Sequence, residues 1–276
     1  MGRITKRMRA GSLAVGIAVG LGLGMTLGAQ GLLQRQAAIT RRAIGKPLGE
    51  QAPDADGTVR KRYAGTRIDL LMVGDSVAAG LGADRPKDTL GVRLAREVAK
   101  AAQRPVRLRT VARVGAESSM VAEQLASLPA SYRPDVAVIV VGGNDVTHRV
   151  PVAESVLHLQ EAVRWLQERG VEVVVGTCPD LGALRPVPQP LRALGARASR
   201  QLASAQREAV LAMGARAVSL AQVAGPFFIT NPDEMFSLDR FHPSGMGYKR
   251  IAKAMAPSVL AALGLAERLP FGHHAP

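Results

Sequence analysis

The chain has 276 residues and a formal net charge of +14, and 47% of its residues are hydrophobic. That apolar share can bury a full core, which argues against a disordered chain, and the length fits one sizeable domain with appendages. Aromatic residues make up only 3%, so the core must be built from Ala, Val and Leu, which favours helices packed on a sheet over an all-β sandwich. The single cysteine, Cys178, excludes an intramolecular disulfide.

The positive charge is concentrated at the N-terminus. Residues 1–46 contain eight Lys and Arg residues and no acidic residue, which leaves 28 basic against 22 acidic residues in the rest of the chain. That remainder is only mildly basic and contains no recognisable RNA- or DNA-binding motif. We therefore expect no nucleic-acid partner.

An apolar stretch follows the first basic residues. From Ala10 to Leu33 there are 24 residues without charge, and a membrane-spanning helix needs about 20. Residues 1–34 are therefore predicted to be a signal anchor, with the domain outside the cytoplasm, or a signal peptide that ends near Gly28 and Ala29 and leaves the protein secreted. A buried soluble helix is the third alternative, and seven glycines make it a poor helix in water. The first two alternatives make the membrane a partner of this segment.

Three further segments complete the predicted organisation. Residues 35–66 are rich in charge, Pro and Gly with weak periodicity, which is typical of a linker or stalk. The folded domain is predicted over residues 67–265. Residues 266–276 form a short polar tail containing His273 and His274, which we expect to be disordered.

Strands and helices alternate through the folded domain. Short apolar runs predict strands at 68–73, 106–112, 135–141, 171–176 and 215–220. Helical patterns lie between and after them, at 89–102, 119–128, 153–169, 191–213 and 245–263. This alternation predicts a parallel sheet with helices on both faces, and in such sheets ligands bind beyond the carboxyl ends of the strands.

Polar and glycine residues follow the first three predicted strands. Ser76, in the sequence Gly-Asp-Ser, lies on a strand-to-helix turn that would expose its hydroxyl and leave its amide free to bind an anion. Gly115 allows close backbone approach to a ligand, and Asn144 offers a side-chain amide. An N-cap serine, a turn glycine and an Asx turn are the ordinary alternatives for these three residues. Asp145 is interpreted as structural, bonding neighbouring amides.

An Asp–His pair lies close to the C-terminus. Asp239 precedes His242 by three residues, so its carboxylate can reach the imidazole Nδ1–H and leave Nε2 to act as a base. Pro243 restricts His242 to an extended conformation. A serine, two possible amide donors and this pair would converge on one edge of the sheet, which is the arrangement that acyl transfer requires.

These residues resemble the SGNH or GDSL hydrolases in four blocks that occur in the family's order. The blocks are GDS at 74–76, a lone glycine at Gly115, GxND at 142–145 and DxxHP at 239–243. The resemblance implies a three-layer α/β/α fold like flavodoxin, with a five-stranded parallel sheet. It also implies an esterase, lipase or acylhydrolase that uses no metal or other cofactor. The one departure is Val77, where Leu or Ile is frequent, and that position concerns packing.

The same resemblance implies a role for each matching residue. Ser76 would be the nucleophile, His242 the general base and then acid, and Asp239 the residue that orients His242. The Ser76 amide, the Gly115 amide and the Asn144 side chain would form the oxyanion hole. Residues 67–265 would then be a serine ester hydrolase that forms an acyl-enzyme intermediate on a small-molecule, lipid or carbohydrate ester.

Two other functions stay open from the sequence. One is an O-acyltransferase or deacetylase that acts on cell-envelope carbohydrate, and the other is a non-catalytic envelope-binding module. Cys178 has no base near it in sequence and is interpreted as structural. The His, Cys and acidic spacings match no zinc site, and the glycines after Ser76 lack the spacing of a nucleotide-binding loop. The connection Pro179–Pro190, which contains four prolines, lies near the predicted site and is a candidate for shaping its pocket.

Overall fold

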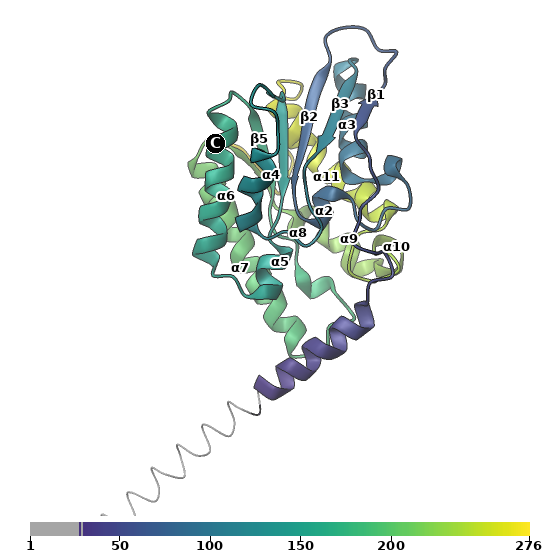
Figure 1. Ribbon diagram of the computed structural model, residues 1–276, viewed down its shortest axis with the longest axis vertical. Coiled ribbons are helices and arrows are strands. Elements are labelled where there is room, and N and C mark those ends of the chain that lie inside the picture. The colour runs from purple at the N-terminus through teal and green to yellow at the C-terminus, as the bar shows by residue number, and fades with distance from the viewer. Residues whose placement is uncertain (1–27, 29) are drawn as a thin grey trace, which may run out of the picture.

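A computed structural model describes residue 28 and residues 30–276 (Figure 1). Of the apolar stretch predicted to anchor the chain, residues 10–33, only residue 28 and residues 30–33 are among the described residues. None of the helices in the described part of the chain is long and apolar enough to cross a membrane.

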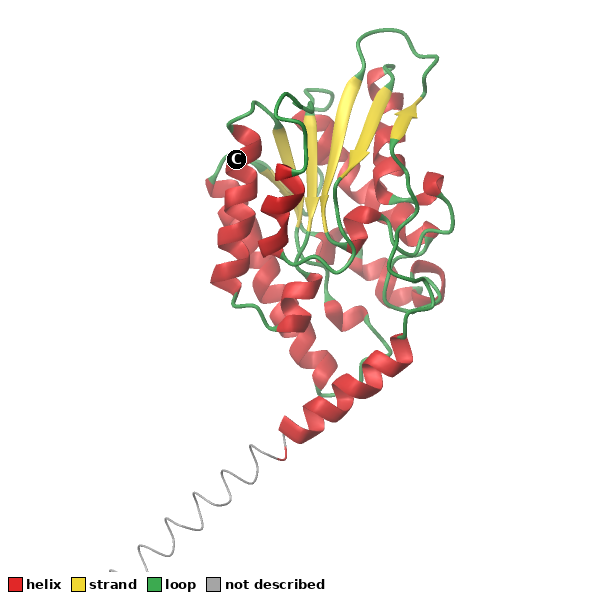
Figure 2. Cartoon of the chain, viewed as in Figure 1, coloured by secondary structure: helices red, strands yellow, loops and turns green. Residues whose placement is uncertain are grey.

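The centre of the domain is a seven-stranded sheet (Figure 2). Five strands are parallel: β2 (Ile68–Gly74), β3 (Val106–Thr110), β4 (Val136–Val140), β5 (Glu172–Gly176) and β6 (Arg216–Val218). They lie in the order β3-β2-β4-β5-β6, so the first strand of the five is flanked by the second and third, as in flavodoxin. Two short antiparallel strands, β1 (Gly57–Val59) and β7 (His273–His274), extend the sheet at its two edges.

Long helices cover both faces of the sheet. Helices α3 (Leu90–Ala102) and α11 (Gly245–Ala262) pack on one face, and α4 (Val121–Ala126), α6 (Val152–Gln167) and α7 (Leu191–Ala212) pack on the other. The shorter helices are α2 (Ser76–Ala79), η1 (Pro86–Asp88), η2 (Ser118–Met120), α5 (Gly143–His148), η3 (Leu181–Ala183), α8 (Leu220–Val223), α9 (Gly225–Thr230) and α10 (Pro232–Met235). The predicted three-layer α/β/α fold is confirmed.

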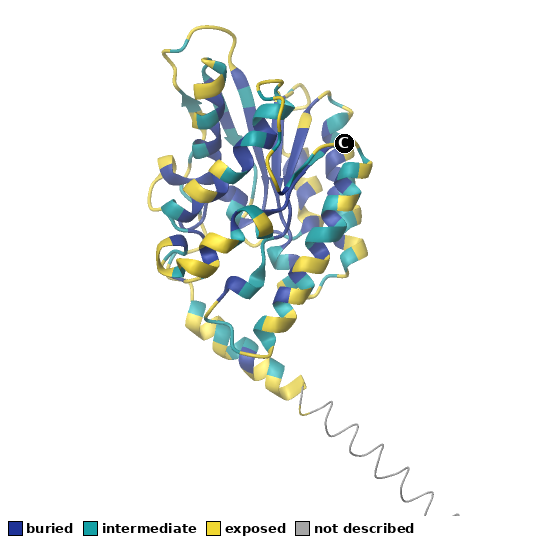
Figure 3. Ribbon diagram, turned by 180° about the vertical axis from the view of Figure 1, so that it is seen from behind, coloured by how far each residue is buried: buried dark blue, intermediate teal, exposed yellow. Residues whose placement is uncertain are grey.

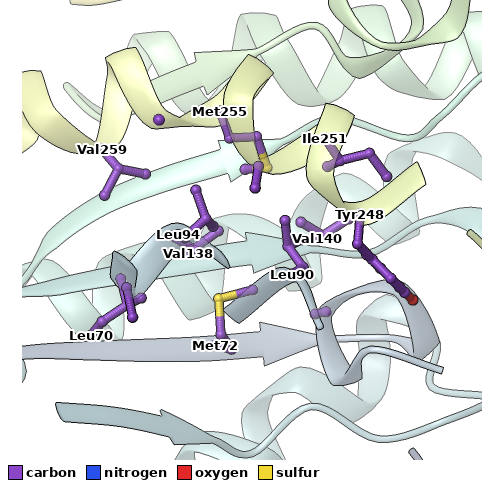
Figure 4. Packing of buried hydrophobic residues seen from close by; sticks show 14 of the residues in the cluster. Leu70, Met72, Leu90, Leu94, Val138, Val140, Tyr248, Ile251, Met255 and Val259 are labelled. Carbon is purple, nitrogen blue, oxygen red and sulfur yellow. The ribbon is translucent and has the colours of Figure 1, made fainter. Parts of the chain in front are cut away.

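Side chains that alternate along each strand build one core on each face. In β2, Leu70 and Met72 join the cluster beneath α3 and α11, as Figure 4 shows, whereas Leu71 and Val73 join the cluster beneath α6. Successive side chains of a strand point to opposite faces, so a strand buried on both faces must be continuously apolar. The buried residues accordingly form a continuous layer through the middle of the domain (Figure 3).

The segment predicted as a linker, 35–66, contains regular structure that packs on the domain. Residues 30–44 include a helix, whose Gln36 is buried, and Gly57–Val59 pair with β3 as strand β1. The Asp56 carboxylate accepts the Thr110 N–H at 2.7 Å and so fixes this edge strand. A three-residue strand and a helix with one buried position give no periodic pattern that a sequence could reveal.

The prediction of a disordered tail was wrong for His273 and His274. These residues form β7 and pair with β6. His273 Nδ1 lies 2.7 Å from Ser258 Oγ, and His274 Nε2 lies 3.2 Å from Ser219 Oγ. The tail is held by partners that precede it by 15 and 55 residues, and no local pattern indicates them.

Candidate active site

The predicted site residues lie at the end of the sheet where the parallel strands terminate. Figure 1 shows α2, α5 and α8 gathered at this end, and they follow β2, β4 and β6 respectively in the chain. Ser76 begins α2 and Asn144 lies in α5. His242 lies in the connection that leads into α11. The topology therefore assembles residues that are up to 166 positions apart in sequence.

The backbone before Ser76 adopts a conformation that requires glycine. Gly74 has φ +129°, and a Cβ at this position would collide with the Val140 carbonyl of the neighbouring strand. The buried side chain of Gln124 accepts the Gly74 N–H at 2.9 Å and donates to its carbonyl at 2.8 Å. The turn after β2 is thus fixed from the strand side and from α4.

Asp75 caps the short helix that Ser76 begins. Its carboxylate accepts the Val77 N–H at 2.9 Å, so the first turn of α2 forms although the helix has only four residues. Burial raises the pKa of the Asp75 carboxyl to about 6, and the hydrogen bond from Val77 offsets part of that rise. Sequence reasoning did not single out this residue. Its place before the serine was the only available signal.

Ser76, His242 and Asp239 form a continuous hydrogen-bonded chain. His242 Nε2 lies 3.0 Å from Ser76 Oγ, and His242 Nδ1 lies 2.6 Å from Asp239 Oδ2. The second oxygen of Asp239 accepts the backbone N–H groups of Phe241 and His242, both at 2.9 Å. The structure therefore brings the three predicted residues into the predicted contacts.

The Asp239 carboxylate is buried, but both of its oxygens have hydrogen-bond partners within the protein. Burial acts to raise its pKa, but the hydrogen bonds from the His242 ring and from the Phe241 and His242 amides outweigh burial and hold the pKa below its usual value. An ionised carboxylate can only accept hydrogen bonds, so Nδ1 of His242 carries the proton in this contact. In the neutral ring, the Nε2 atom that faces Ser76 then has no proton and can accept the proton of the Ser76 hydroxyl.

The loop that contains Gly115 lies against the start of α5, which contains Asn144. Asn144 Nδ2 donates to the Ala116 carbonyl at 2.8 Å, which joins the residue after Gly115 to the start of α5. Gly115 has φ +82° and is exposed, with open space where a side chain would lie. The carboxylate of Asp145 accepts the Ser118 N–H, so this residue is structural, as predicted.

A pocket opens beside Ser76. Ser76, Asn144 and His242 line it, whereas Gly115 lies outside its wall and connects to it through Ala116 and Asn144. Most of the remaining lining side chains are apolar: Leu181, Ala183, Leu184, Leu220, Ala224, Phe228, Phe236, Phe241 and Ile251. The first three belong to the connection Pro179–Pro190, as the sequence suggested. The aromatic residues were missed, because isolated aromatic residues in a short helix, as for Phe228, or in the connections outside the helices, as for Phe236 and Phe241, give no functional signal.

The Cys178 thiol is not exposed as a nucleophile in the folded protein. Cys178 is fully buried, and burial raises the pKa of its thiol well above the usual value, so it stays protonated. Among residues 30–276, no group of three or more His, Cys, Asp or Glu side chains could hold a metal ion.

Comparison with known proteins identifies the family. Residues 72–250 match the model of the GDSL-like lipase/acylhydrolase family. The chain is also 40% identical over 232 residues to the GDSL-like esterase Rv1075c of Mycobacterium tuberculosis, covering 80% of this chain and 74% of that protein. The chain therefore belongs to the GDSL-like lipase/acylhydrolase family, and it is a carboxylic ester hydrolase.

Solved structures show the same fold at low identity. The psychrotrophic esterase EstA from Pseudoalteromonas sp. aligns with a TM-score of 0.56 and 20% identity, over 71% of this chain and 98% of the esterase. Axe2, an acetylxylan esterase from Geobacillus stearothermophilus, aligns with a TM-score of 0.56 and 16% identity, over 75% of this chain and 100% of the enzyme. At these identities the similarity concerns the fold alone.

Proposed function

We propose that the chain hydrolyses esters through a Ser76–His242–Asp239 triad and an acyl-enzyme intermediate. The observation that supports this mechanism is the unbroken sequence of contacts from Asp239 Oδ2 to His242 Nδ1 and from His242 Nε2 to Ser76 Oγ, at 2.6 and 3.0 Å. Both distances lie within hydrogen-bond reach, as a nucleophile, its base and the group that orients the base require.

The reaction takes place in two steps. Ser76 Oγ attacks the ester carbonyl while His242 Nε2 takes its proton, and the tetrahedral intermediate collapses when His242 returns that proton to the departing alcohol. Water then attacks the acyl carbonyl while His242 Nε2 takes a proton from it. The bond to Ser76 Oγ breaks as His242 returns that proton to Oγ, and the acyl group leaves as a carboxylic acid. Asp239 holds the His242 ring in place and stabilises the positive charge that the ring carries between the two transfers.

The negative oxygen of each intermediate needs donors close to Ser76. The Ser76 amide begins α2 and has no partner within that helix, so it is available to donate. The Nδ2 atom of Asn144 has two hydrogens and uses one on the Ala116 carbonyl. We assign the second hydrogen, the Ser76 amide and the Gly115 amide to the oxyanion.

The pocket favours an ester whose acyl group is apolar. Leucine and phenylalanine side chains dominate its wall, so a hydrocarbon chain would lose contact with water there. A lipid ester fits this wall better than an acetylated sugar does. Transfer of the acyl group to a carbohydrate is the second candidate reaction, since the same acyl-enzyme intermediate can react with a sugar hydroxyl in place of water.

We propose further that residues 1–34 attach the protein to a membrane with the catalytic domain outside the cytoplasm. The support is the uncharged stretch of 24 residues from Ala10 to Leu33. Cleavage of this segment would give a secreted enzyme. Membrane fractionation of cells, followed by protease treatment of intact spheroplasts and N-terminal sequencing of the product, distinguishes an anchored form, a secreted form and a cytoplasmic form.

Hydrolysis of p-nitrophenyl esters from acetyl to palmitoyl tests the mechanism. The full chain in detergent is compared with Ser76→Ala and His242→Ala, and thermal unfolding of each variant verifies that it is folded. Turnover by the parent and its loss in both folded variants is the expected result. Retained turnover in either variant overturns the triad. A parent that is inactive on every ester, but that transfers an acyl group to a sugar acceptor, is an acyltransferase.

A further inference from the structure

The helix at residues 30–44 contacts the loop that forms one wall of the pocket. Of the described residues in this helix only Gln36 is buried, with 7% of its surface exposed. Gln36 Nε2 donates to the Gln189 carbonyl at 2.5 Å, and Gln36 Oε1 accepts the Leu191 N–H at 3.1 Å. Figure 1 shows this helix, in purple, beyond the end of the sheet at which the parallel strands terminate.

Gln36 supplies the hydrogen-bond partner of the first N–H of the neighbouring helix. Leu191 is the first residue of α7, and its N-cap residue, Pro190, makes no side-chain capping bond. The first N–H groups of a helix have no partner within it and need one from elsewhere. An amide side chain from a segment 155 positions earlier takes this place.

The same contact fixes the far end of the pocket loop. The loop begins after Cys178, which is fully buried, and its residues Leu181, Ala183 and Leu184 line the pocket. It ends at residues 189–191, which Gln36 holds through two hydrogen bonds. The Val187 N–H donates to the Leu184 carbonyl at 3.1 Å, which links the residues of the pocket wall to the end of the loop that Gln36 holds. Loss of the contact would remove two of the hydrogen bonds that hold this end of the loop and would leave the triad untouched. The bonds from the Arg192 N–H to the Pro188 carbonyl and from the Ala193 N–H to the Gln189 side chain would remain.

We propose that Gln36 is a positioning residue that sets the preference for acyl-chain length, because it holds the loop wall of the acyl pocket in place. This proposal rests on the proposed ester hydrolysis. An acetyl group would need only the space next to Ser76, whereas a longer chain would extend along the pocket wall, which includes Leu181 and Leu184. A displaced wall therefore weakens binding of long chains and leaves acetyl esters largely unaffected.

The test compares Gln36→Ala and Gln36→Glu with the parent, using the full chain in detergent. Gln36→Glu keeps an acceptor for the Leu191 N–H but places a carboxylate oxygen against the Gln189 carbonyl in place of the donor, so it should disrupt the contact at least as much as Gln36→Ala does. The matched control is Gln34→Ala, which removes the same side chain from an exposed position on the same helix. Values of kcat and KM are measured for acetyl, butyryl and octanoyl esters, and amide hydrogen exchange is followed in peptides that span 181–195.

In Gln36→Ala we expect kcat/KM for the octanoyl ester to fall about tenfold through KM, with the acetyl ester within twofold, since about two hydrogen bonds are lost. Amide hydrogen exchange in residues 185–191 should accelerate in Gln36→Ala, whereas the control Gln34→Ala should exchange at the rate of the parent. Equal losses on all three esters, or faster loop exchange without a change in chain-length preference, overturn the proposal. A parent without ester turnover would remove the proposed function instead, and unchanged loop exchange in Gln36→Ala would then still refute the positioning role.

Discussion

Asp145 accepts the backbone N–H of Ser118, with its two oxygens 3.2 and 3.1 Å from that nitrogen. It also accepts the Ser155 hydroxyl at 2.8 Å, and it is almost fully buried. This contact joins α5, which begins next to Asn144, to the loop that follows Gly115. Gly115 and Asn144, two of the donors proposed for the oxyanion hole, are therefore held relative to each other by a carboxylate that does not line the pocket.

Asp145→Ala should lower both stability and turnover. The change leaves the buried Ser118 N–H and Ser155 hydroxyl without a partner, at about 1–3 kcal/mol each, so the free energy of unfolding should fall by about 2–6 kcal/mol. The Gly115 loop and α5 would then no longer be fixed relative to each other, and the displaced oxyanion donors should lower kcat by roughly 10²-fold. Urea unfolding and steady-state kinetics measure the two effects. Asp84→Ala, which removes an exposed carboxylate, is the control and should change neither.

Asn144→Ala should lower kcat with little effect on KM, and the variant should remain folded. The variant loses one of the donors proposed for the oxyanion, and removal of such a donor costs about 10²–10³-fold in kcat. The contact with the carbonyl of Ala116, a buried residue, is lost as well, which should lower the free energy of unfolding by about 1–3 kcal/mol. Kinetics with an ester that the parent hydrolyses, together with a thermal melt, provide the test. A kcat within threefold of the parent would remove Asn144 from the mechanism.

Asp239→Asn should abolish most of the activity without unfolding the protein. The asparagine oxygen can still accept the amides of Phe241 and His242, but its NH2 group would face His242 Nδ1. The ring would then place its proton on Nε2, where it cannot accept the Ser76 proton, and the expected loss is about 10³–10⁴-fold in kcat. Circular dichroism establishes that the variant is folded. Activity within tenfold of the parent would show that the carboxylate is dispensable.

Cys178 should play no part in turnover. Its thiol is fully buried and its pKa is raised, so iodoacetamide should neither label the native protein nor reduce its activity. A fluorophosphonate should inactivate the same sample and label the peptide that contains Ser76. Mass spectrometry of the digested protein after each reagent distinguishes the two nucleophiles. Inactivation that follows Cys178 alkylation of the folded protein would contradict the assignment.

The sequence was a good guide to the elements that surround the site. The strand predicted at 68–73 is β2, and the helix predicted at 245–263 is α11, each within a residue or two of its observed ends. A strand that is buried on both faces of the sheet is a continuous apolar run, and a helix that packs on the sheet has apolar residues at helical spacing. Both patterns can be recognised in the sequence because they arise from burial. The residues after these strands could be located because a parallel sheet brings its carboxyl ends to one edge.

The parts that the sequence did not indicate depend on distant partners. β7 has only two residues and is held by Ser219 and Ser258, and the helix at 30–44 contacts the domain through Gln36. Gln124, which holds both polar groups of Gly74, lies 50 positions from it and resembles any polar residue of a short helix. Contacts of this kind are set by tertiary packing and produce no local pattern.

The stability of the protein should depend on pH through Asp75. Burial raises the pKa of this carboxyl from 3.8 to about 6 in the folded state, so the folded state binds its proton more tightly than the unfolded chain does. The contribution of this group to stability is therefore fully present below about pH 4 and is lost as pH rises through about 6. The total change is on the order of 3 kcal/mol.

Asp75→Asn should remove this dependence. Asparagine cannot ionise, and its side-chain oxygen can still accept the Val77 N–H and cap α2. At pH 8 the variant should be more stable than the parent by about 1–3 kcal/mol, whereas the two should have nearly equal stability at pH 4. Urea unfolding midpoints of both proteins at the two pH values provide the measurement. A difference of the same size at both pH values would show that Asp75 acts through its hydrogen bond and not through its buried charge.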